Sequence, residues 1–423
     1  MTPAPAQPIY KAPRQTASTP VARPNERSRS ILWTIDLPML LVTMLLVAIG
    51  SLMIYSTTFD WSYQEFGSDT AIFMVHVRNL GIGAVLMFGM LMVTYRFWKR
   101  ISVVLLLATI GGLIAVLVFS DATFGARRAF LQGSYQPGEL AELVIVVYLA
   151  AWLGSKQTKV ASIAFGLIPF AILVGGVGVL VLLQPDLSTA VTILLVATLM
   201  YFLSGANIMH LVVAGGFLGV AGYILSQNFS YAQGRVSSYI AGLTDLTQTN
   251  YHAQQAIIAF LNGGLTGRGL GQGFQKFGNL PTSHTDSIFA VIGEELGLVG
   301  AMFVILLYVL LAMRGFHIAR HARDSFGALL AAGVTLLIVT KAMLNIAVML
   351  NLLPSTGVAL PFISYGGSSL VTMLAGVGLL LSVARVTAIE TSPERGGSRA
   401  HHDRGWRNRW TRLSGDGHRR SAR

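Results

Sequence analysis

Residues 288–311, IFAVIGEELGLVGAMFVILLYVLL, form an apolar run of 24 residues with only two charged side chains. A helix that crosses the hydrocarbon core of a bilayer needs roughly 20 such residues. Comparable segments recur along the chain, separated by charged or Gly- and Pro-containing turns. They lie at residues 37–57, 76–95, 101–120, 138–154, 161–183, 188–205, 208–226, 287–313, 327–350 and 359–386. The pattern predicts an all-α polytopic membrane protein with ten transmembrane helices.

The composition excludes a set of soluble domains. Of the 423 residues, 53% are hydrophobic and 11% are charged, whereas soluble domains carry roughly 25% charged residues. The chain therefore has too few polar side chains to cover several globules, and no nucleic-acid partner is expected from its net charge of +12. The absence of cysteine excludes disulfides, thiolate nucleophiles and thiolate-bound zinc.

The distribution of basic residues predicts the topology. With the N-terminus inside, 23 of the 30 Lys and Arg residues fall on the cytoplasmic side, as the positive-inside rule requires. Both termini are therefore expected in the cytoplasm. Residues 1–30 and 389–423 are predicted to be disordered basic tails around a membrane domain at residues 31–388. A large extracytoplasmic loop, at about residues 227–286, precedes the eighth helix.

The large loop contains a glycine-rich stretch, GGLTGRGLGQG, at residues 263–273. Closely spaced glycines let backbone N–H groups approach an anion, so they could cradle a substrate pyrophosphate near Arg268. The stretch matches neither GxxxxGK[ST] nor GxGxxG, and no βαβ pattern surrounds it. A tightly turning re-entrant or surface loop is the alternative interpretation.

Two further outer segments carry polar candidates. Arg127 and Arg128 are adjacent, and paired guanidinium groups suit phosphate oxygens, although a solvated or headgroup-facing pair has the same sequence. Gln184 and Asp186 interrupt an apolar stretch beside Pro185. Asp186 could cap the following helix or serve a functional site near the membrane surface.

Asp286 directly precedes the apolar run at residues 288–311. It could cap that helix, or it could act as a general base at the membrane–water boundary. Glu294 and Glu295 lie deeper in the same helix and need a partner or a polar cavity. Lys341 is the partner that its depth suggests.

A polar, Gly-rich run, LPSTGVALPFISYGGSSL at residues 353–370, leads into the last span. Irregular backbone at membrane depth needs protein or water partners. Close packing of helices through small residues would explain the same composition. Function and packing therefore both stay open for this run.

Four groups of motifs resemble one known family. They are GARR (125–128) with YQPGELAEL (135–143), QPDLSTA (184–190), the block from GGLTGRGLGQGFQK to LPTSHTDSIFAVIGEELGLVG (263–300), and LPFISYGGSSL (360–370). In this order they are similar to the SEDS family (shape, elongation, division and sporulation) of FtsW and RodA, and closer to FtsW. The resemblance extends from the first span to the tenth. Family members often have Glu at Thr282 and Lys near Glu142, and Gly138 is a further departure.

The resemblance implies a peptidoglycan glycosyltransferase that polymerises lipid II on the outer face of the bacterial cytoplasmic membrane, in cell division or cell-shape maintenance. The reaction would invert the anomeric carbon and release undecaprenyl pyrophosphate, with Asp286 as general base and Arg127 and Arg128 neutralising the pyrophosphate. A divalent cation could share that work, but no ligand set for a metal is identifiable. The further substrate-binding candidates are Gln136, Gln184, Asp186, Arg268, Lys276, His284, Thr285, Ser364, Tyr365, Ser368 and Ser369.

The resemblance also implies partners. These are lipid II, the nascent glycan strand, membrane lipids and a class B penicillin-binding protein, a single-span transpeptidase. Outward apolar and small-residue stripes on the eighth and ninth spans are candidate contact faces for the transpeptidase. A lipid II flippase or a division-complex scaffold would use many of the same features, because intramembrane charges and ten spans also suit a transporter.

Overall fold

The computed structural model describes residues 35–119, 136–155, 160–210, 212–213, 215–216, 230–245 and 248–391. Within these ranges the regular elements are helical, with no strand. Eight helices there are long and apolar enough to cross a membrane. They are α1 (Leu37–Phe66), α2 (Ala71–Met92), α3 (Tyr95–Phe119), α4 (Pro137–Ser155), the π-helical turn η3 (Ile163–Leu167) continued by α5 (Ile168–Leu182), α10 (Ile288–His321), α11 (Ser325–Met349) and α12 (Gly367–Thr391).

These helices confirm a multi-pass membrane protein, whereas the predicted number of ten spans stays a prediction. The predicted sixth span corresponds to α6 (Leu187–Leu203), which has only 17 residues. The predicted seventh span, residues 208–226, lies mostly outside the described residues. The large outer loop contains two helices, α8 (Ser230–Gly242) and α9 (Tyr251–Gly263).

The predicted ends of two spans were wrong. α1 continues to Phe66, beyond the predicted end at residue 57, and ends where Gly67 adopts a φ of 68° and donates its N–H to the Tyr63 carbonyl. α12 begins at Gly367, not at residue 359, because residues 353–366 form irregular backbone. Of the predicted C-terminal tail, residues 389–391 still belong to α12, and the rest lies outside the described residues, as residues 1–30 do.

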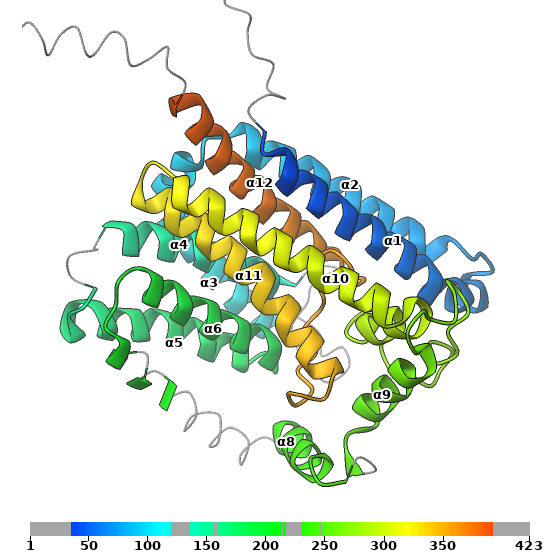
Figure 1. Cartoon of the computed structure of the whole chain (residues 1–423). Helices are drawn as coiled ribbons and strands as arrows, with labels where there is room; N and C mark the ends of the chain where they lie inside the picture. The colour runs from blue at the N-terminus through cyan, green and yellow to red at the C-terminus, as the bar shows by residue number, and fades with distance from the viewer. Residues whose placement is uncertain are drawn as a thin grey trace, which may run out of the picture.

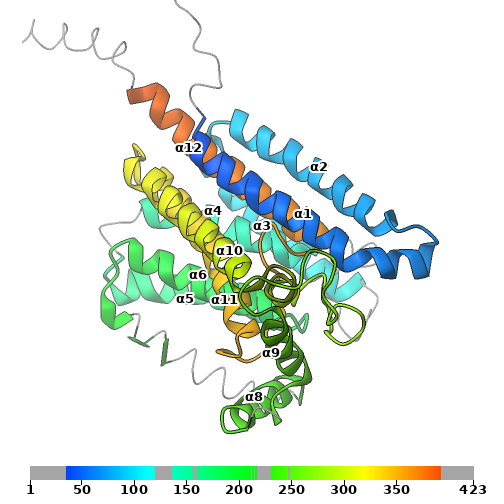
Figure 2. The ribbon, with the colours of Figure 1, turned by 45° about the vertical axis from the view of Figure 1, so that its right-hand side comes forward.

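Burial divides the helices into a central and a peripheral group. In α4, α11 and α12, 61%, 72% and 78% of the most apolar window is buried, against 22% to 33% in the other five candidate spans. α12 packs along α2, and α10 packs along α11 (Figure 1, Figure 2). The peripheral helices leave large apolar side chains exposed, which is the pattern of surfaces that face lipid.

Charged residues tie the helices together at the end of the bundle where α1 begins and α12 ends (Figure 1). Arg314 of α10 forms an ion pair with Asp36, at 2.7 Å. Arg96 of α3 forms ion pairs with Asp324 at 3.1 Å and with Glu390 of α12 at 2.7 Å. The described ends of the chain therefore lie on the same side of the bundle, as the distribution of basic residues predicted.

Candidate active site

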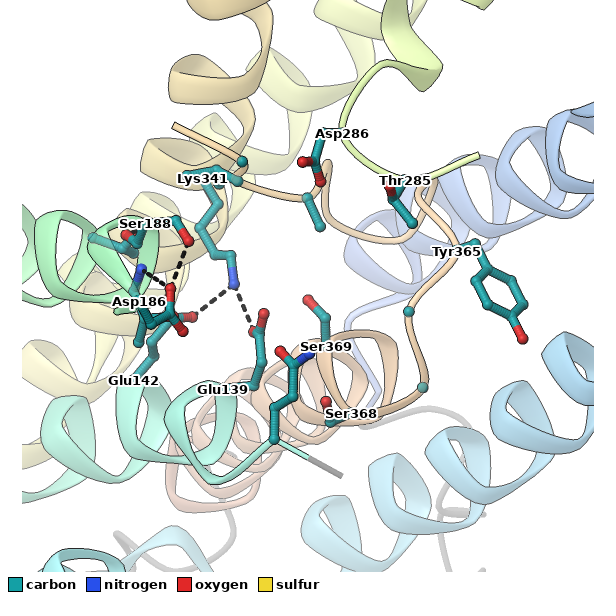
Figure 3. Close-up of a pocket in the computed structure, with 18 residues that line it drawn as sticks. Glu139, Glu142, Asp186, Ser188, Thr285, Asp286, Lys341, Tyr365, Ser368 and Ser369 are labelled. Carbon is teal, nitrogen blue, oxygen red and sulfur yellow. Dashed lines mark hydrogen bonds and ion pairs between the residues drawn. The ribbon is translucent and has the colours of Figure 1, made fainter. Parts of the chain in front are cut away.

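A polar cavity of about 310 Å³ lies at the opposite end of the bundle, among α4, α6, α10, α11 and α12 (Figure 3). It contains seven of the predicted site residues: Gln136, Asp186, Thr285, Asp286, Tyr365, Ser368 and Ser369. The helices contribute mainly their N-terminal ends, so segments far apart in the sequence meet here. Residues that the prediction missed complete the lining, and they include Glu139, Ser188, Thr189, Thr192 and Gly357.

Asp286 is held at the edge of this cavity through its backbone. The Asn345 side-chain amide, on α11, donates to the carbonyl oxygens of Asp286 and Val358, each at 2.7 Å. One side chain thus fixes the start of α10 against the loop before α12. The N-cap position of α10 is Ser287, so Asp286 lies one residue before the cap.

The loop before α12 supports the same segment from its other side. Ser364 Oγ donates to the Thr285 carbonyl at 2.6 Å, and the Tyr365 N–H donates to the His284 carbonyl at 2.8 Å. Gly357 has a φ of +80°, and a Cβ there would lie 3.3 Å from Asp286 Oδ2. A larger residue at position 357 would be strained and would crowd the carboxylate.

Lys341 of α11 lies in the same cavity between two glutamates of α4 (Figure 3). Its ammonium group is 2.7 Å from Glu139 Oε2 and 2.8 Å from Glu142 Oε2. The predicted pairing of Lys341 with Glu294 and Glu295 was wrong, because this face of α11 packs against α4. α11 thus supplies the positive charge beside Glu142.

Asp186 combines the two interpretations that the sequence left open. Its carboxylate accepts hydrogen bonds from the backbone N–H and hydroxyl of Thr189, at 3.2 and 2.8 Å, and from the Ser188 hydroxyl at 2.7 Å. It is therefore the N-cap of α6, which confirms the capping interpretation. It also lines the cavity, so capping does not remove it from the site.

Negative charge exceeds positive charge in the described lining. Glu139, Glu142, Asp186 and Asp286 are balanced only by Lys341 there. An anionic substrate group therefore needs further cations. Arg127 and Arg128 lie outside the described residues, in the segment that ends just before Gln136. Among the residues the structure describes, no group of three or more His, Asp or Glu is arranged to hold a metal ion.

His284 contributes packing beside the cavity. Its ring centroid is 5.1 Å from that of Trp61 and 5.8 Å from that of Tyr365. Burial lowers the pKa of His284 below its usual value of 6.5, so the ring is neutral at pH 7. The ring therefore adds no positive charge to the site.

Three predicted site residues lie away from the cavity and make structural contacts. Gln184 is buried, and its amide donates to the Leu113 carbonyl at 3.0 Å. The Arg268 guanidinium lies over the Phe274 ring, 5.0 Å from its centroid. Lys276 is likewise buried, and its ammonium group contacts Glu295 of α10 at 2.7 Å, the Gly271 carbonyl at 2.9 Å and Ser56 of α1 at 3.0 Å.

This loop binds α10 rather than presenting its N–H groups to the cavity. α10 departs from helical geometry at Gly297 (φ 69°, ψ −170°). There the N–H groups of Arg268 and Gly269 donate to carbonyl oxygens of α10, each at 3.0 Å. The N–H group of Leu298 donates back to the Gly264 carbonyl at 2.9 Å. The loop thus replaces hydrogen bonds that the helix loses at its break.

The two buried glutamates of α10 complete this contact. Glu294 accepts the N–H groups of Phe274 and Gln275, both at 3.1 Å. Glu295 accepts the Gly271 N–H at 3.0 Å and forms an ion pair with Lys276 at 2.7 Å. Carboxylates of the protein therefore occupy the N–H groups of Gly271 and of the two residues that follow the glycine-rich stretch, which supports the structural interpretation of the loop.

Four polar residues in or beside the site had a further signal in their spacing along the sequence. Lys341 and Asn345 are four residues apart in an apolar helix, a spacing that places both side chains on one face. Glu139 and Glu142 share the corresponding spacing of three on α4. Polar faces on two apolar helices indicate a buried polar contact, but they do not show which helices meet.

A bundle of membrane-spanning helices with a carboxylate-lined cavity at one end defines the class: a polytopic membrane protein with a polar site. The family of cell cycle proteins that comprises FtsW, RodA and SpoVE matches residues 36–389. The chain belongs to this family.

Two curated relatives are similar over most of their length. The probable peptidoglycan glycosyltransferase FtsW of Geobacter sulfurreducens is 37% identical over 357 residues, which cover 82% of this chain and 95% of that protein. The stage V sporulation protein E of Bacillus subtilis is 37% identical over 358 residues, covering 83% and 97%.

Solved structures agree with this family assignment. A chain of a peptidoglycan synthase complex, studied for the coordination of polymerization and crosslinking, superposes with a TM-score of 0.68 and 28% identity, covering 84% of this chain and 98% of that one. The rod shape determining protein RodA of Thermus thermophilus gives a TM-score of 0.62 and 28% identity, with coverage of 83% and 97%.

Proposed function

We propose that this chain is a peptidoglycan glycosyltransferase that polymerises lipid II into glycan strands, in cell division or cell-shape maintenance. The names of its relatives support this activity. The observation in the structure that carries the proposal is the position of Asp286. Its carboxylate lies at the edge of a partly open polar cavity, and α11 and the loop before α12 hold the segment that carries it. A general base needs this combination of access to substrate and fixed geometry.

In the proposed reaction, the Asp286 carboxylate accepts the proton of the GlcNAc 4-hydroxyl of the acceptor. The hydroxyl oxygen then attacks the anomeric carbon of the donor MurNAc. A new glycosidic bond forms as the bond from that carbon to the pyrophosphate oxygen breaks. The anomeric centre inverts, and undecaprenyl pyrophosphate leaves with the bonding electron pair.

The departing pyrophosphate requires positive charge, because the described cavity lining is rich in carboxylates. We assign this task to Arg127 and Arg128, whose forked guanidinium groups suit phosphate oxygens. Lys341 keeps Glu139 and Glu142 from adding two uncompensated negative charges nearby. Stabilising charge that develops in the transition state is usually the largest contribution to such catalysis.

The remaining cavity residues fit the binding of the two substrates, lipid II and the nascent glycan strand. Gln136, Thr285, Ser368 and Ser369 offer amide and hydroxyl groups around Asp286. Sugars present the matching hydroxyl and acetamido groups. We place the cavity on the outer face of the bacterial cytoplasmic membrane, because the opposite end of the bundle adjoins the basic tails.

A second partner is proposed for an apolar groove of about 650 Å³ between α10 and α11. Tyr308, Met313, Val339 and Met343 are among the residues that line it. The groove runs along two candidate spans and suits the single membrane helix of a class B penicillin-binding protein. Membrane lipids would cover it when that partner is absent.

Asp286→Asn tests the proposed function. Asparagine keeps the size of the side chain but cannot accept the proton, so polymerisation should fall by roughly 10²- to 10⁴-fold. The assay incubates the purified protein and its cognate transpeptidase with lipid II and analyses the glycan strands on gels. Asp60→Asn, a carboxylate of α1 outside the cavity, is the matched control and should retain activity.

The outcome separates the alternatives. A membrane-inserted Asp286→Asn protein that still makes long strands would refute Asp286 as the base. Loss of lipid II translocation in that active variant would instead support the flippase alternative.

A further inference from the structure

Large apolar side chains are exposed where α9 ends and along the glycine-rich loop that follows it. Leu261, Leu265, Leu270 and Phe274 are 76%, 69%, 50% and 62% exposed. None of these four residues lines the polar cavity around Asp286. Exposed apolar side chains gathered in one short segment mark a surface that binds a partner or a membrane. We call these four residues, together with Arg268, the loop face.

Two helices fix the depth of this region relative to a bilayer. Asp36 pairs with Arg314 at one end of the bundle, and Ser56 donates to Glu295 at 2.8 Å toward the other end. These two contacts are joined by residues 36–56 in α1 and by residues 295–314 in α10. At about 1.5 Å per residue each path is about 30 Å long, which is the thickness of the hydrocarbon core. The contact of Ser56 with Glu295 therefore lies at a boundary between lipid and water.

The glycine-rich loop is held at the same boundary. Lys276 pairs with Glu295 at 2.7 Å and donates to Ser56 at 3.0 Å. The Phe277 ring packs edge-on against Phe59 of α1, with the ring centroids 5.9 Å apart. Figure 1 shows this segment near the end of α1, away from the described ends of the chain. The loop face therefore lies where the hydrocarbon core meets the headgroups.

The loop face also continues a surface of α10 that faces lipid. The Val299 N–H donates to the Leu265 carbonyl at 3.2 Å, so the two backbones adjoin. Val299 is 66% exposed, and Met302, about one turn further along, is 54% exposed. Both belong to a helix that is long and apolar enough to cross a membrane. Lipid that covers Val299 therefore reaches Leu265 as well.

Arg268 gives the loop face a cation at the depth of phospholipid phosphates. Its guanidinium lies 5.0 Å from the centroid of the Phe274 ring and donates to the Asn262 carbonyl at 3.3 Å, and the residue is exposed. Neither contact carries a formal negative charge, so the guanidinium keeps charge and donors for an anion. Lys276, in contrast, is buried and paired with Glu295. Apolar side chains beside an exposed cation are typical of surfaces that bind phospholipid membranes.

We propose that the loop face is a membrane-binding surface: its four apolar side chains enter the adjoining lipid leaflet, and Arg268 binds the phosphate of a phospholipid. The glycine-rich loop is then an anchor for α10 rather than a part of the substrate site. Glu294 and Glu295 hold the loop against α10, so the anchor fixes the level of Asp286 relative to the lipid surface. The inference does not depend on the chemistry proposed for Asp286.

Cysteine alkylation tests the insertion, because the chain has no cysteine of its own. Leu265→Cys and Leu270→Cys are introduced singly into the full chain, which is reconstituted in nanodiscs of phosphatidylcholine and phosphatidylglycerol. A charged maleimide that does not enter lipid reports the exposure of each cysteine to water. Both positions should react about 10- to 100-fold more slowly than Gln248→Cys, an exposed position between α8 and α9, because lipid covers them.

A second measurement identifies lipid as the cover. A nitroxide attached to the same cysteines should be more accessible to oxygen, which dissolves in lipid, than to a water-soluble nickel complex. Its depth should be about 5–10 Å below the headgroup boundary. Leu306→Cys, at an exposed position in the middle of α10, provides the reference for contact with lipid.

Arg268→Gln tests the phosphate contact in the Leu265→Cys protein. Loss of one cation at the lipid surface should raise the alkylation rate about fivefold in these nanodiscs. In nanodiscs of digalactosyldiacylglycerol, a bilayer lipid without phosphate, Arg268→Gln should leave the rate unchanged. Arg100→Gln, which removes an exposed arginine of α3 near the opposite end of the bundle, is the matched control and should have no effect in either lipid.

Each result supports or overturns the proposal. Alkylation of both loop-face cysteines as fast as at Gln248→Cys overturns the insertion. Protection that appears only after the cognate transpeptidase is added also overturns it, since the loop face would then be a protein contact. An Arg268→Gln effect that is absent, or equally large without lipid phosphate, overturns the phosphate contact. None of these measurements reads activity, so their failure leaves the proposed polymerisation of lipid II unaffected.

Discussion

Lys341 shows how one residue controls the charge of the polar cavity. Its ammonium group is almost fully buried and contacts both glutamates of α4. A buried ion pair contributes little net stability compared with apolar residues, but the loss of one partner leaves an uncompensated charge. Here one lysine compensates two carboxylates, so its removal is worse than the removal of either glutamate.

At this scale we predict that Lys341→Met lowers the free energy of unfolding by about 3–5 kcal/mol. Glu142→Gln is the matched variant, and it should cost less because Lys341 keeps its ion pair with Glu139. Chemical denaturation of the detergent-solubilised proteins would measure both. Equal losses in the two variants would contradict the central role of Lys341.

At the scale of elements, the break in α10 at Gly297 couples the helix to the glycine-rich loop. The loop approaches so closely that a Cβ at Gly267 would lie 2.2 Å from the Glu295 carbonyl oxygen. Gly267 also has a φ of +79°, which L-residues with a side chain adopt only at a cost. The same glycines that suggested phosphate binding thus allow two backbones to pack against each other.

A matched pair of glycines separates these two effects. Gly271 has nearly the same φ, +78°, but a Cβ there would meet nothing within 4 Å. Gly271→Ala should therefore cost only the conformational penalty of about 1–2 kcal/mol. Gly267→Ala should cost a further 1–3 kcal/mol or so, because backbone atoms must move apart. Thermal unfolding in detergent would compare the two, and similar Tm values would show that the close approach is unimportant.

At the scale of the whole molecule, function depends on the orientation of the bundle in the membrane. The polar cavity lies at the end opposite to the ion pairs of Asp36, Arg96 and Arg314. Basic residues of the sequence also concentrate on the side of those ion pairs. A site on the outer face is therefore the expectation that follows from the charge distribution.

This orientation predicts the result of reporter fusions. A reporter fused after Arg323, between α10 and α11, should read cytoplasmic. A reporter inserted near Gln248, between α8 and α9, should read extracytoplasmic. Alkaline phosphatase and a fluorescent protein that matures only in the cytoplasm would report the two sides. A cytoplasmic signal near Gln248 would place the polar cavity on the cytoplasmic side, which would contradict polymerisation on the outer face.

The sequence by itself determined the helical membrane class, most of the spans and the family. These properties depend on local hydropathy and on motifs that are contiguous in the chain. It also singled out Asp286, Thr285 and the SYGGSS run at residues 364–369, because polar residues next to long apolar segments can be recognised from the sequence alone. Seven of its candidate residues meet in the polar cavity.

Only the tertiary structure decided which polar residues meet. Depth in the membrane suggested Lys341 for Glu294 and Glu295, yet Lys341 pairs with α4 and Lys276 pairs with Glu295. Arg235 of α8 likewise donates to the Ser355 carbonyl in the loop before α12, across 120 positions of sequence. Hydropathy fixes how deep a side chain lies, whereas its partner depends on how each helix is rotated and which neighbour it packs against.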